Sequence, residues 1–324
     1  MRSLLRSIPA LFSTVALLAS CITIPLGSQK PTLYFQVAGS GAANVYMMRV
    51  DGIITAQSST LGFIPGETVP STVEQVRFQL DRLERDEIRP VGILLRINSP
   101  GGTVTASDII YHELAAFKKK HGIPIVVLMM DIAASGGYYI AMSADSVVAH
   151  PTTTTGSLGV IMPSINVSRF METYGLVDAS IMSGPMKDLH SMTQPTDRSH
   201  ELVVQSVVDD LYQRFVEVVR KNRGDRLKKP MEEIADGRIY TASQAKEVGL
   251  VDRIGYFDDA LDELRRLSGV SEFRVITLGH QPDAGDPTIY MQQSARPRVN
   301  LGVLSALAGL QQSSAPFYYL WLPR

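Results

Sequence analysis

Short apolar runs that alternate with longer amphipathic stretches are the feature that most limits the fold of this chain. Strand-like runs occupy residues 44–50, 91–97 and 123–130, and charged amphipathic stretches occupy residues 71–85 and 105–120. Apolar runs of four to eight residues bounded by turn residues are typical of buried strands, and strands that alternate with helices favour a largely parallel sheet. The sequence therefore predicts an α/β protein.

Length and charge limit the possible functions. The 324 residues, 45% of them hydrophobic, can bury the core of one large domain or two small ones. The formal net charge of −1 gives no general electrostatic reason to bind nucleic acid. The sequence contains no metal-binding cluster, phosphate-binding loop or dinucleotide fingerprint, so we expect neither a metal nor a cofactor.

Two glycine-rich turns follow predicted strands. Asn98-Ser-Pro-Gly-Gly102 follows the run at 91–97, and a Ser-Gly-Gly turn at residues 135–137 follows the next run. Glycine permits close backbone approach, so a substrate carbonyl could reach both a hydroxyl and uncovered amide N–H groups. A serine-glycine turn alone is more often structural, but the two turns together favour a nucleophilic Ser135 beside an oxyanion hole.

A serine hydroxyl is a weak nucleophile until a base removes its proton. None of the six histidines carries a triad signature, and Ser135 lacks the Gly-x-Ser-x-Gly elbow of esterase-type hydrolases. Lysine is the remaining candidate for the base.

The Ser-Gly-Gly turn and two further motifs follow one another in the middle of the chain. They are Ala134-Ser-Gly-Gly-Tyr138, Thr155-Gly-Ser-Leu-Gly-Val160 and Ser183-Gly-Pro-Met-Lys-Asp188. Their order and spacing resemble the signal peptide peptidase A family of serine-lysine proteases. The resemblance also includes residues 98–102 and 237–252, and it covers the chain from about residue 45 to residue 269.

The resemblance implies a role for each matching residue. Ser135 corresponds to the nucleophile, Lys187 to the general base, and Ser157 to the hydroxyl that orients the lysine amine. The amides of Gly102 and Gly136 correspond to the oxyanion hole.

Elementary chemistry supports a lysine base in this setting. A lysine acts as a base only when it is neutral, so its reference pKa of about 10.4 must fall by several units through burial. Residues 181–186 form a neutral stretch that could desolvate the amine of Lys187. Asp188 would favour the ammonium form, so we expect its carboxylate to point away from Lys187 and to make a structural hydrogen bond or salt bridge.

The resemblance also implies an architecture and partners. The expected fold is the crotonase-like (Clp protease-like) α/β fold with repeated ββα units. Single-length members of the family form ring-like homo-octamers whose active sites are shared between protomers. The implied substrates are signal peptides and other unfolded peptides. Met130 and Ile132 are candidates for the substrate pocket, with plain core packing as the alternative.

The first residues predict export. A basic segment at residues 1–6 precedes an apolar segment at residues 8–18 that is short for a membrane span. Leu18-Ala-Ser-Cys21 resembles the bacterial lipobox, and Cys21 is the only cysteine. We therefore expect a lipidated Cys21 that ties the protein to a membrane of the bacterial cell envelope, facing the periplasm or exterior. A signal-anchor or a plain secretory signal is the alternative.

The expected organisation has four parts. Residues 1–20 form a lipoprotein signal peptide, 21–43 a linker, 44–270 the crotonase-like protease domain, and 271–324 a C-terminal strand, linker and apolar tail. Apolar residues near the C-terminus do not normally stay in water. Our hypothesis is that the tail docks on a neighbouring protomer or occupies a peptide groove as an internal substrate mimic, with membrane contact or self-packing as the alternative.

The sequence thus predicts an exported, membrane-anchored serine endopeptidase with a Ser-Lys dyad. A catalytically silent peptide-binding lipoprotein scaffold is the main alternative. A coenzyme A thioester enzyme of the crotonase superfamily is a weaker one, because the export signal and the Ser-Lys pair speak against a cytosolic cofactor.

Overall fold

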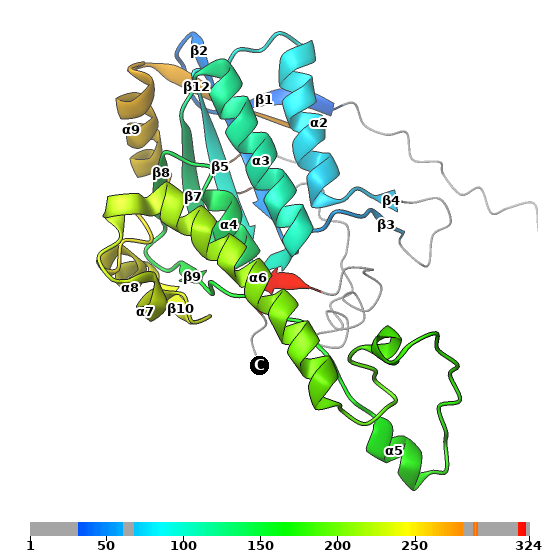
Figure 1. Ribbon diagram of the computed structural model, residues 1–324. Coiled ribbons are helices and arrows are strands. Elements are labelled where there is room, and N and C mark those ends of the chain that lie inside the picture. Colours follow the sequence, from blue (N-terminus) through cyan, green and yellow to red (C-terminus); the bar gives the residue numbers. More distant parts are fainter. Residues whose placement is uncertain (1–31, 61–67, 281–287, 289, 291–316, 322–324) are drawn as a thin grey trace, which may run out of the picture.

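The computed structural model of the protein describes residues 32–60, 68–280, 288, 290 and 317–321. Within these residues a sheet of nine strands lies between helices (Figure 1). Seven strands follow the order β1-β12-β2-β5-β7-β8-β11, while β9 pairs with the end of β7 and β10 pairs with β9. The strands are β1 (Thr32–Gly39), β2 (Ala43–Asp51), β5 (Gly92–Ser99), β7 (Ile125–Ala134), β8 (Ser146–Ala149), β9 (Thr154–Gly156), β10 (Ile239–Thr241), β11 (Arg253–Ile254) and β12 (Phe273–His280).

The sheet is mostly parallel. Every neighbouring pair from β12 through β2, β5, β7 and β8 to β11 is parallel, and β1 runs antiparallel to β12 at one edge. Parallel strands end at the same edge of a sheet, so the turns that follow β5 and β7 lie together. The predicted α/β architecture is confirmed.

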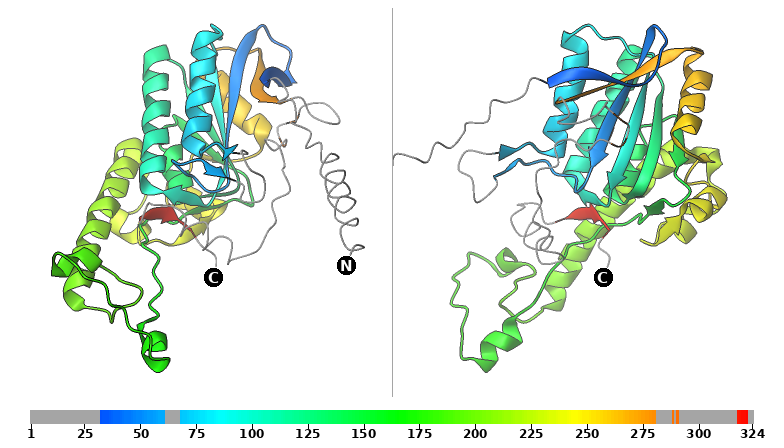
Figure 2. Two further views of the ribbon diagram at one scale, coloured as in Figure 1. Left: turned by 90° about the vertical axis from the view of Figure 1, so that its right-hand side faces the viewer. Right: turned by 180° about the vertical axis from the view of Figure 1, so that it is seen from behind.

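Helices cover both faces of the sheet (Figure 2). One face packs against α2 (Thr72–Arg85), α3 (Val104–His121), α4 (Gly136–Ala141) and the C-terminal part of α6 (Arg198–Arg223). The other packs against α9 (Phe257–Ser268). The strands supply side chains to a separate apolar cluster on each face, as expected for a parallel sheet that is buried on both sides.

Local sequence signals fix the ends of these helices. The hydroxyl of Thr103 accepts a hydrogen bond from the amide of Ala106 and begins α3. Gly122 ends that helix in the left-handed conformation, with φ of 64°. Ser71 and Glu74 form a reciprocal capping box at the start of α2.

Shorter elements complete the described residues. Strand β3 pairs with β4, and β6 pairs with β13. No described helix is both long and apolar enough to cross a membrane. The short elements are β3 (Ser59–Thr60), β4 (Thr68–Val69), β6 (Gly101–Thr103), α5 (Ser168–Thr173), α7 (Met231–Ile234), α8 (Ala242–Glu247), β13 (Tyr318–Leu320), and single 3-10 turns at Pro185–Asp188 and Gly224–Arg226.

The sheet begins earlier in the chain than the sequence suggested. Residues 32–39 lie in the segment expected to be a linker, but they form β1 and pair with β12. Their sequence, Thr-Leu-Tyr-Phe-Gln-Val-Ala-Gly, is rich in residues that favour strands, and β12 offers an edge for them to pair with. The expected long helix at residues 197–222 is present as α6.

An arm, defined here as residues 162–210, projects from the sheet and its helices (Figure 1). It contains α5, the turn Pro185–Asp188 and the N-terminal half of α6. None of its residues is buried in the single protomer. Its exposed apolar side chains are Ile165, Phe170, Tyr174, Leu176, Val177, Ile181, Met182, Met186, Met192, Leu202, Val203 and Val207.

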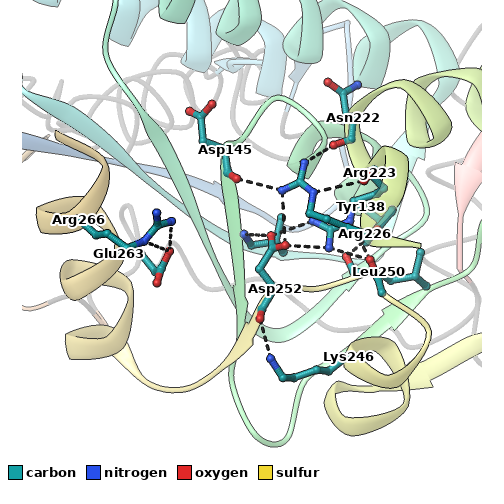
Figure 3. A network of polar contacts seen from close by, with 12 residues as sticks. Tyr138, Asp145, Asn222, Arg223, Arg226, Lys246, Leu250, Asp252, Glu263 and Arg266 are labelled. Atoms are coloured by element: carbon teal, nitrogen blue, oxygen red, sulfur yellow. Dashed lines mark hydrogen bonds and ion pairs between the residues drawn. The ribbon is translucent and has the colours of Figure 1, made fainter. Parts of the chain in front are cut away.

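A buried ion pair fastens the other end of α6 (Figure 3). Both terminal nitrogens of Arg223 donate to the carboxylate of Asp252, at 2.8 and 3.0 Å, and the same carboxylate accepts from the amide of Val147. The hydroxyl of Tyr138 in α4 donates to the carbonyl of Leu250 nearby. These contacts join α6, α4 and β8 to the segment that leads into β11.

Candidate active site

Ser135 lies in a strained turn between β7 and α4. Its backbone has φ of 52° and ψ of −114°, a region that side-chain-bearing residues rarely adopt. The residue is 1% exposed, and its Oγ has no hydrogen-bond partner among the described residues. A strained backbone and an unsatisfied buried hydroxyl both carry a cost, and they concentrate at functional sites. These features support Ser135 as a candidate nucleophile, a role that stays a prediction.

The two predicted oxyanion glycines lie side by side. Gly102 belongs to β6 and Gly136 opens α4. A Cβ atom built on Gly136 would lie 3.1 Å from the amide nitrogen of Gly102 and 2.4 Å from Oγ of Ser107. The structure thus brings two backbone amides together beside Ser135, where side chains would not fit. Their role as an oxyanion hole stays a prediction.

Strand pairing places Ser157 next to the nucleophile turn. The parallel register of β9 and β7 sets Gly156 opposite Ala134, and the amide of Ser135 donates to the carbonyl of Gly156 at 2.8 Å. Ser157 is the next residue after Gly156, so it lies beside Ser135. Like Ser135, it has a positive φ, of 51°, and it is buried. This position suits a hydroxyl that orients an incoming amine.

Lys187 lies apart from this cluster in the single protomer. It belongs to the turn Pro185–Asp188 of the arm, and its side chain is exposed. No hydrogen bond joins Lys187 to Ser135 or Ser157 among the described residues. The side chain of the neighbouring Asp188 forms neither a hydrogen bond nor an ion pair within the part of the chain that the structure describes, so the structural contact expected for it is absent there.

The chain's own C-terminal strand lies against the candidate site. Strand β13 pairs antiparallel with β6, so that Tyr319 faces Gly102. On its other side, Tyr318 exchanges two backbone hydrogen bonds with Ile161, both of 3.0 Å. Residues 317–321 are therefore paired on both edges beside the glycine turn, and the two hypotheses for the tail stay predictions. The tail at residues 291–316 lies outside the described residues.

Sequence reasoning missed the aromatic residues that surround this strand. The ring of Tyr319 packs against Tyr139 of α4 and Phe215 of α6, and its hydroxyl donates to the carbonyl of Leu211 at 2.9 Å. The aromatic residues at positions 317–321 indicated that this segment packs against other parts of the protein. Nothing in the local sequence indicated which residues cover it.

The two candidates for the substrate pocket, Met130 and Ile132, have different surroundings. Met130 packs against the apolar cluster on the α9 face of the sheet, whereas Tyr319 belongs to the cluster on the opposite face. Ile132 pairs with Thr154 of β9. Their assignment to a substrate pocket stays a prediction.

The predicted lipidation site, Cys21, lies outside the described residues. Within the described ranges, no group of histidine, cysteine, aspartate or glutamate side chains could hold a metal ion.

Comparison with known proteins defines the class and then the family. The family model of Clp protease matches residues 57–155, and that of peptidase family S49 matches residues 117–271. The first match and the mostly parallel sheet define an α/β protein of the Clp protease fold, as predicted.

Individual relatives narrow this class. A protein of Enterococcus faecium named as the signal peptide peptidase SppA is 42% identical over 198 residues, covering 61% of this chain and 57% of that protein. A protein of Synechocystis sp. (strain PCC 6803) named as protease slr0021 is 40% identical over 190 residues, covering 59% of this chain and 68% of that protein. The chain belongs to peptidase family S49, the signal peptide peptidase A family, as its motifs predicted.

A solved structure of a ClpP1 variant from Listeria monocytogenes resembles the chain more distantly. It has 19% sequence identity and a TM-score of 0.42, and the similarity covers 66% of this chain and 94% of that one.

Proposed function

We propose that this protein is a serine endopeptidase that uses Ser135 and Lys187 as a catalytic dyad. One observation carries the proposal. The buried hydroxyl of Ser135 lies in a strained turn beside two glycine amides, and it has no hydrogen-bond partner among the described residues. An extended strand of the chain pairs with the strand that contains one of these glycines. A nucleophile, amide donors and a bound strand are the components that peptide hydrolysis needs.

The proposed chemistry follows from these positions. Oγ of Ser135 attacks the carbonyl carbon of the substrate, and the neutral amine of Lys187 accepts the hydroxyl proton. The amides of Gly102 and Gly136 donate hydrogen bonds to the oxyanion of the tetrahedral intermediate. The C–N bond breaks, the leaving amine takes the proton from Lys187, and water then hydrolyses the acyl-serine to release the new carboxyl end and regenerate Ser135.

A second protomer is part of this proposal, because Lys187 must come from it. The arm that carries Lys187 projects from the sheet, and none of its residues is buried although many are apolar. Apolar surfaces of this extent are typical of protein interfaces. We propose that the arm packs on a neighbouring copy in a ring-like homo-octamer and delivers Lys187 to that copy's Ser135 and Ser157. Burial in the interface would favour the neutral amine.

The location and substrates are also proposals. The basic and apolar segments before Cys21 support export and lipid anchoring in the bacterial cell envelope, facing the periplasm or exterior. A relative named as a signal peptide peptidase and the pairing of an extended strand with β6 support signal peptides and other unfolded segments as substrates. Nothing in the net charge supports nucleic acid as a partner.

One alternative function has an observation in its favour. Lys187 is exposed in the protomer and an extended strand is already paired with β6, which is also what a silent peptide-binding scaffold would show. Such a scaffold would bind peptides without cleaving them.

Hydrolysis of a fluorogenic peptide library by the assembled full chain tests the proposal. We expect Ser135→Ala and Lys187→Ala each to lower kcat by roughly 10⁴-fold, because the two groups act as a unit. Lys221→Ala, at an exposed position of α6 outside the arm, is the matched control and should leave kcat unchanged. Survival of activity in Lys187→Ala would place the base elsewhere. Binding without hydrolysis by the assembled wild type would favour the scaffold.

A further inference from the structure

The hydroxyl of Ser99, at the end of β5, joins the glycine turn to the segment that follows β2. Ser99 is 0% exposed. Its Oγ donates to the carbonyl oxygen of Gly52 at 2.6 Å and accepts from the amide of Gly101 at 3.0 Å. One side chain therefore satisfies a backbone acceptor and a backbone donor that belong to two different segments.

Backbone hydrogen bonds hold the rest of the turn on the same segment. The amide of Ile54 donates to the carbonyl of Gly101 at 2.9 Å, and the carbonyl of Ile54 accepts from the amide of Thr103 at 3.0 Å. Both neighbours of Gly102 are thus fixed by Ile54. The amide of Gly101 is held by the Ser99 side chain instead, in a residue whose φ of 103° only glycine adopts readily.

The glycine turn also touches the start of α4 without side chains between them. A Cβ built on Gly137 would lie 2.8 Å from the carbonyl oxygen of Ser99 and 3.5 Å from its Cβ. A Cβ built on Gly101 would lie 2.7 Å from the amide nitrogen of Gly136. Because the two backbones are in direct contact, any shift of the turn changes the spacing between the amides of Gly102 and Gly136.

Loss of the Ser99 hydroxyl would produce such a shift. The buried amide of Gly101 and the carbonyl of Gly52 would each lose a partner, and a buried backbone group without a partner is costly enough for the turn to move towards another one. Ser143 offers a contrast. It is also buried, but its hydroxyl donates to the carbonyl of Ile140 three residues away and joins no second segment.

We propose that Ser99 is a positioning residue that fixes the spacing of the Gly102 and Gly136 amides. It contacts neither the substrate nor the reacting atoms, and it acts on the proposed oxyanion hole through Gly101. The inference rests on the proposed peptidase function, and it gives the serine of the motif at residues 98–102 a role of its own.

Steady-state kinetics of the assembled full chain test the proposal, with the best substrate of the fluorogenic library. Ser99→Ala should lower kcat on the order of 10- to 100-fold and leave KM within about twofold, because misplaced amides weaken transition-state binding and not substrate binding. Ser143→Ala is the matched control and should change neither constant. An unchanged kcat in Ser99→Ala overturns the proposal, as does an effect confined to KM.

A peptide aldehyde of the same sequence tests where the loss arises. Oγ of Ser135 adds to the aldehyde carbon, the hydroxyl proton passes to the amine of Lys187, and the former carbonyl oxygen becomes an oxyanion at the two amides. The inhibition constant should rise in Ser99→Ala by the same factor as kcat falls. An unchanged inhibition constant would overturn the proposal. If Ser99→Ala does not assemble, Ser99→Cys, whose thiol is a weaker donor and acceptor, replaces it, with a smaller loss expected in both constants.

Hydrogen exchange separates this inference from the proposed chemistry. Amide exchange of residues 98–104 is followed by mass spectrometry in the assembled wild type and in Ser99→Ala. We expect exchange in this segment to become about fivefold faster, while residues 257–268 of α9 stay unchanged. Faster exchange supports the positioning role even if the wild type cleaves no peptide, in which case only the peptidase proposal fails. Unchanged exchange at residues 98–104 overturns the role of Ser99.

Discussion

At Ser135 the backbone conformation and the surrounding glycines depend on one another. The positive φ of Ser135 is strained for a residue with a side chain, and the two nearby glycines lie where a side chain would not fit. A Cβ on Gly102 would collide with backbone atoms of Ile54, and a Cβ on Gly136 would collide with Oγ of Ser107. The candidate site therefore depends on the turn that contains Ser135 and Gly136 and on the turn that contains Gly102, and not on one reactive residue alone.

A methyl group at Gly136 tests this dependence. In Gly136→Ala the new Cβ would meet Oγ of Ser107 at 2.4 Å and the Tyr319 carbonyl oxygen at 3.0 Å. We expect kcat/KM to fall by more than about 100-fold, because the oxyanion donor shifts, with a loss of about 1–3 kcal/mol in unfolding free energy. Gly159→Ala is the control, because a Cβ there meets only ordinary contacts. Full activity in Gly136→Ala would show that this amide does not serve the oxyanion.

Residue motifs predicted that these residues lie close together, whereas their catalytic roles stay predictions. Ser135, Gly136 and Gly102 lie in short patterns that follow apolar runs, and local sequence determines such turns. Tyr319 could not be placed in the same way, because its partner Gly102 is more than two hundred positions away along the chain and only the folded sheet brings the two together. Lys187 was predicted by its motif, but the structure of one protomer does not bring it to Ser135.

At the level of elements, the strands β2, β5 and β7 follow the predicted apolar runs closely, because a strand buried on both faces needs a continuous apolar sequence. Strand β1 was missed because it lies at the edge, where one side is exposed and the pattern is mixed. The pairing order of the strands and the packing of α6 against α4 depend on residues far apart in the sequence, so no local pattern predicts them.

The ion pair between Arg223 and Asp252 carries a prediction about stability at the same scale. Burial alone would raise the pKa of Asp252, but the hydrogen bonds and charge of Arg223 outweigh it and hold the pKa below the ordinary value. Asp252→Asn leaves the buried guanidinium of Arg223 without a countercharge. We expect a loss of about 3 kcal/mol in unfolding free energy at pH 7, measured by urea titration.

The pH dependence of this loss gives an independent check. A depressed carboxylate pKa contributes stability above its unfolded value of about 3.9, and this contribution disappears as the pH falls through the folded-state pKa. The difference between wild type and Asp252→Asn should therefore shrink below about pH 4. Asp262→Asn, which breaks an exposed pair with Arg265, should cost less than about 0.5 kcal/mol at either pH. A constant difference across the pH range would mean that the Asp252 charge is not the source of the stability.

For the whole molecule, the arm poses the main question, because it carries the predicted base away from the protomer's own serine. In the single chain, residues 162–210 are unburied and Ile181 is fully exposed, so the apolar side chains of the arm gain nothing from folding there. Closed symmetric assembly would cover the arm and complete the site in the same step. Only the family resemblance predicted that an active site is shared between two protomers.

Mixing two inactive proteins tests whether the sites are shared. If Ser135 and Lys187 of one site come from different protomers, a site in a mixed ring is intact when a Lys187→Ala subunit supplies the serine and a Ser135→Ala subunit supplies the lysine. Equal amounts of the two variants, dissociated and reassembled together, should then recover about a quarter of wild-type kcat at random mixing. Sites completed within one protomer would recover nothing, because every protomer lacks one group.

Ile181→Asp, introduced into both proteins, should prevent assembly and abolish the recovery, whereas Phe78→Asp, at an exposed phenylalanine of α2 outside the arm, should leave it intact. Recovery that persists with Ile181→Asp would mean that some other surface brings the lysine to the serine.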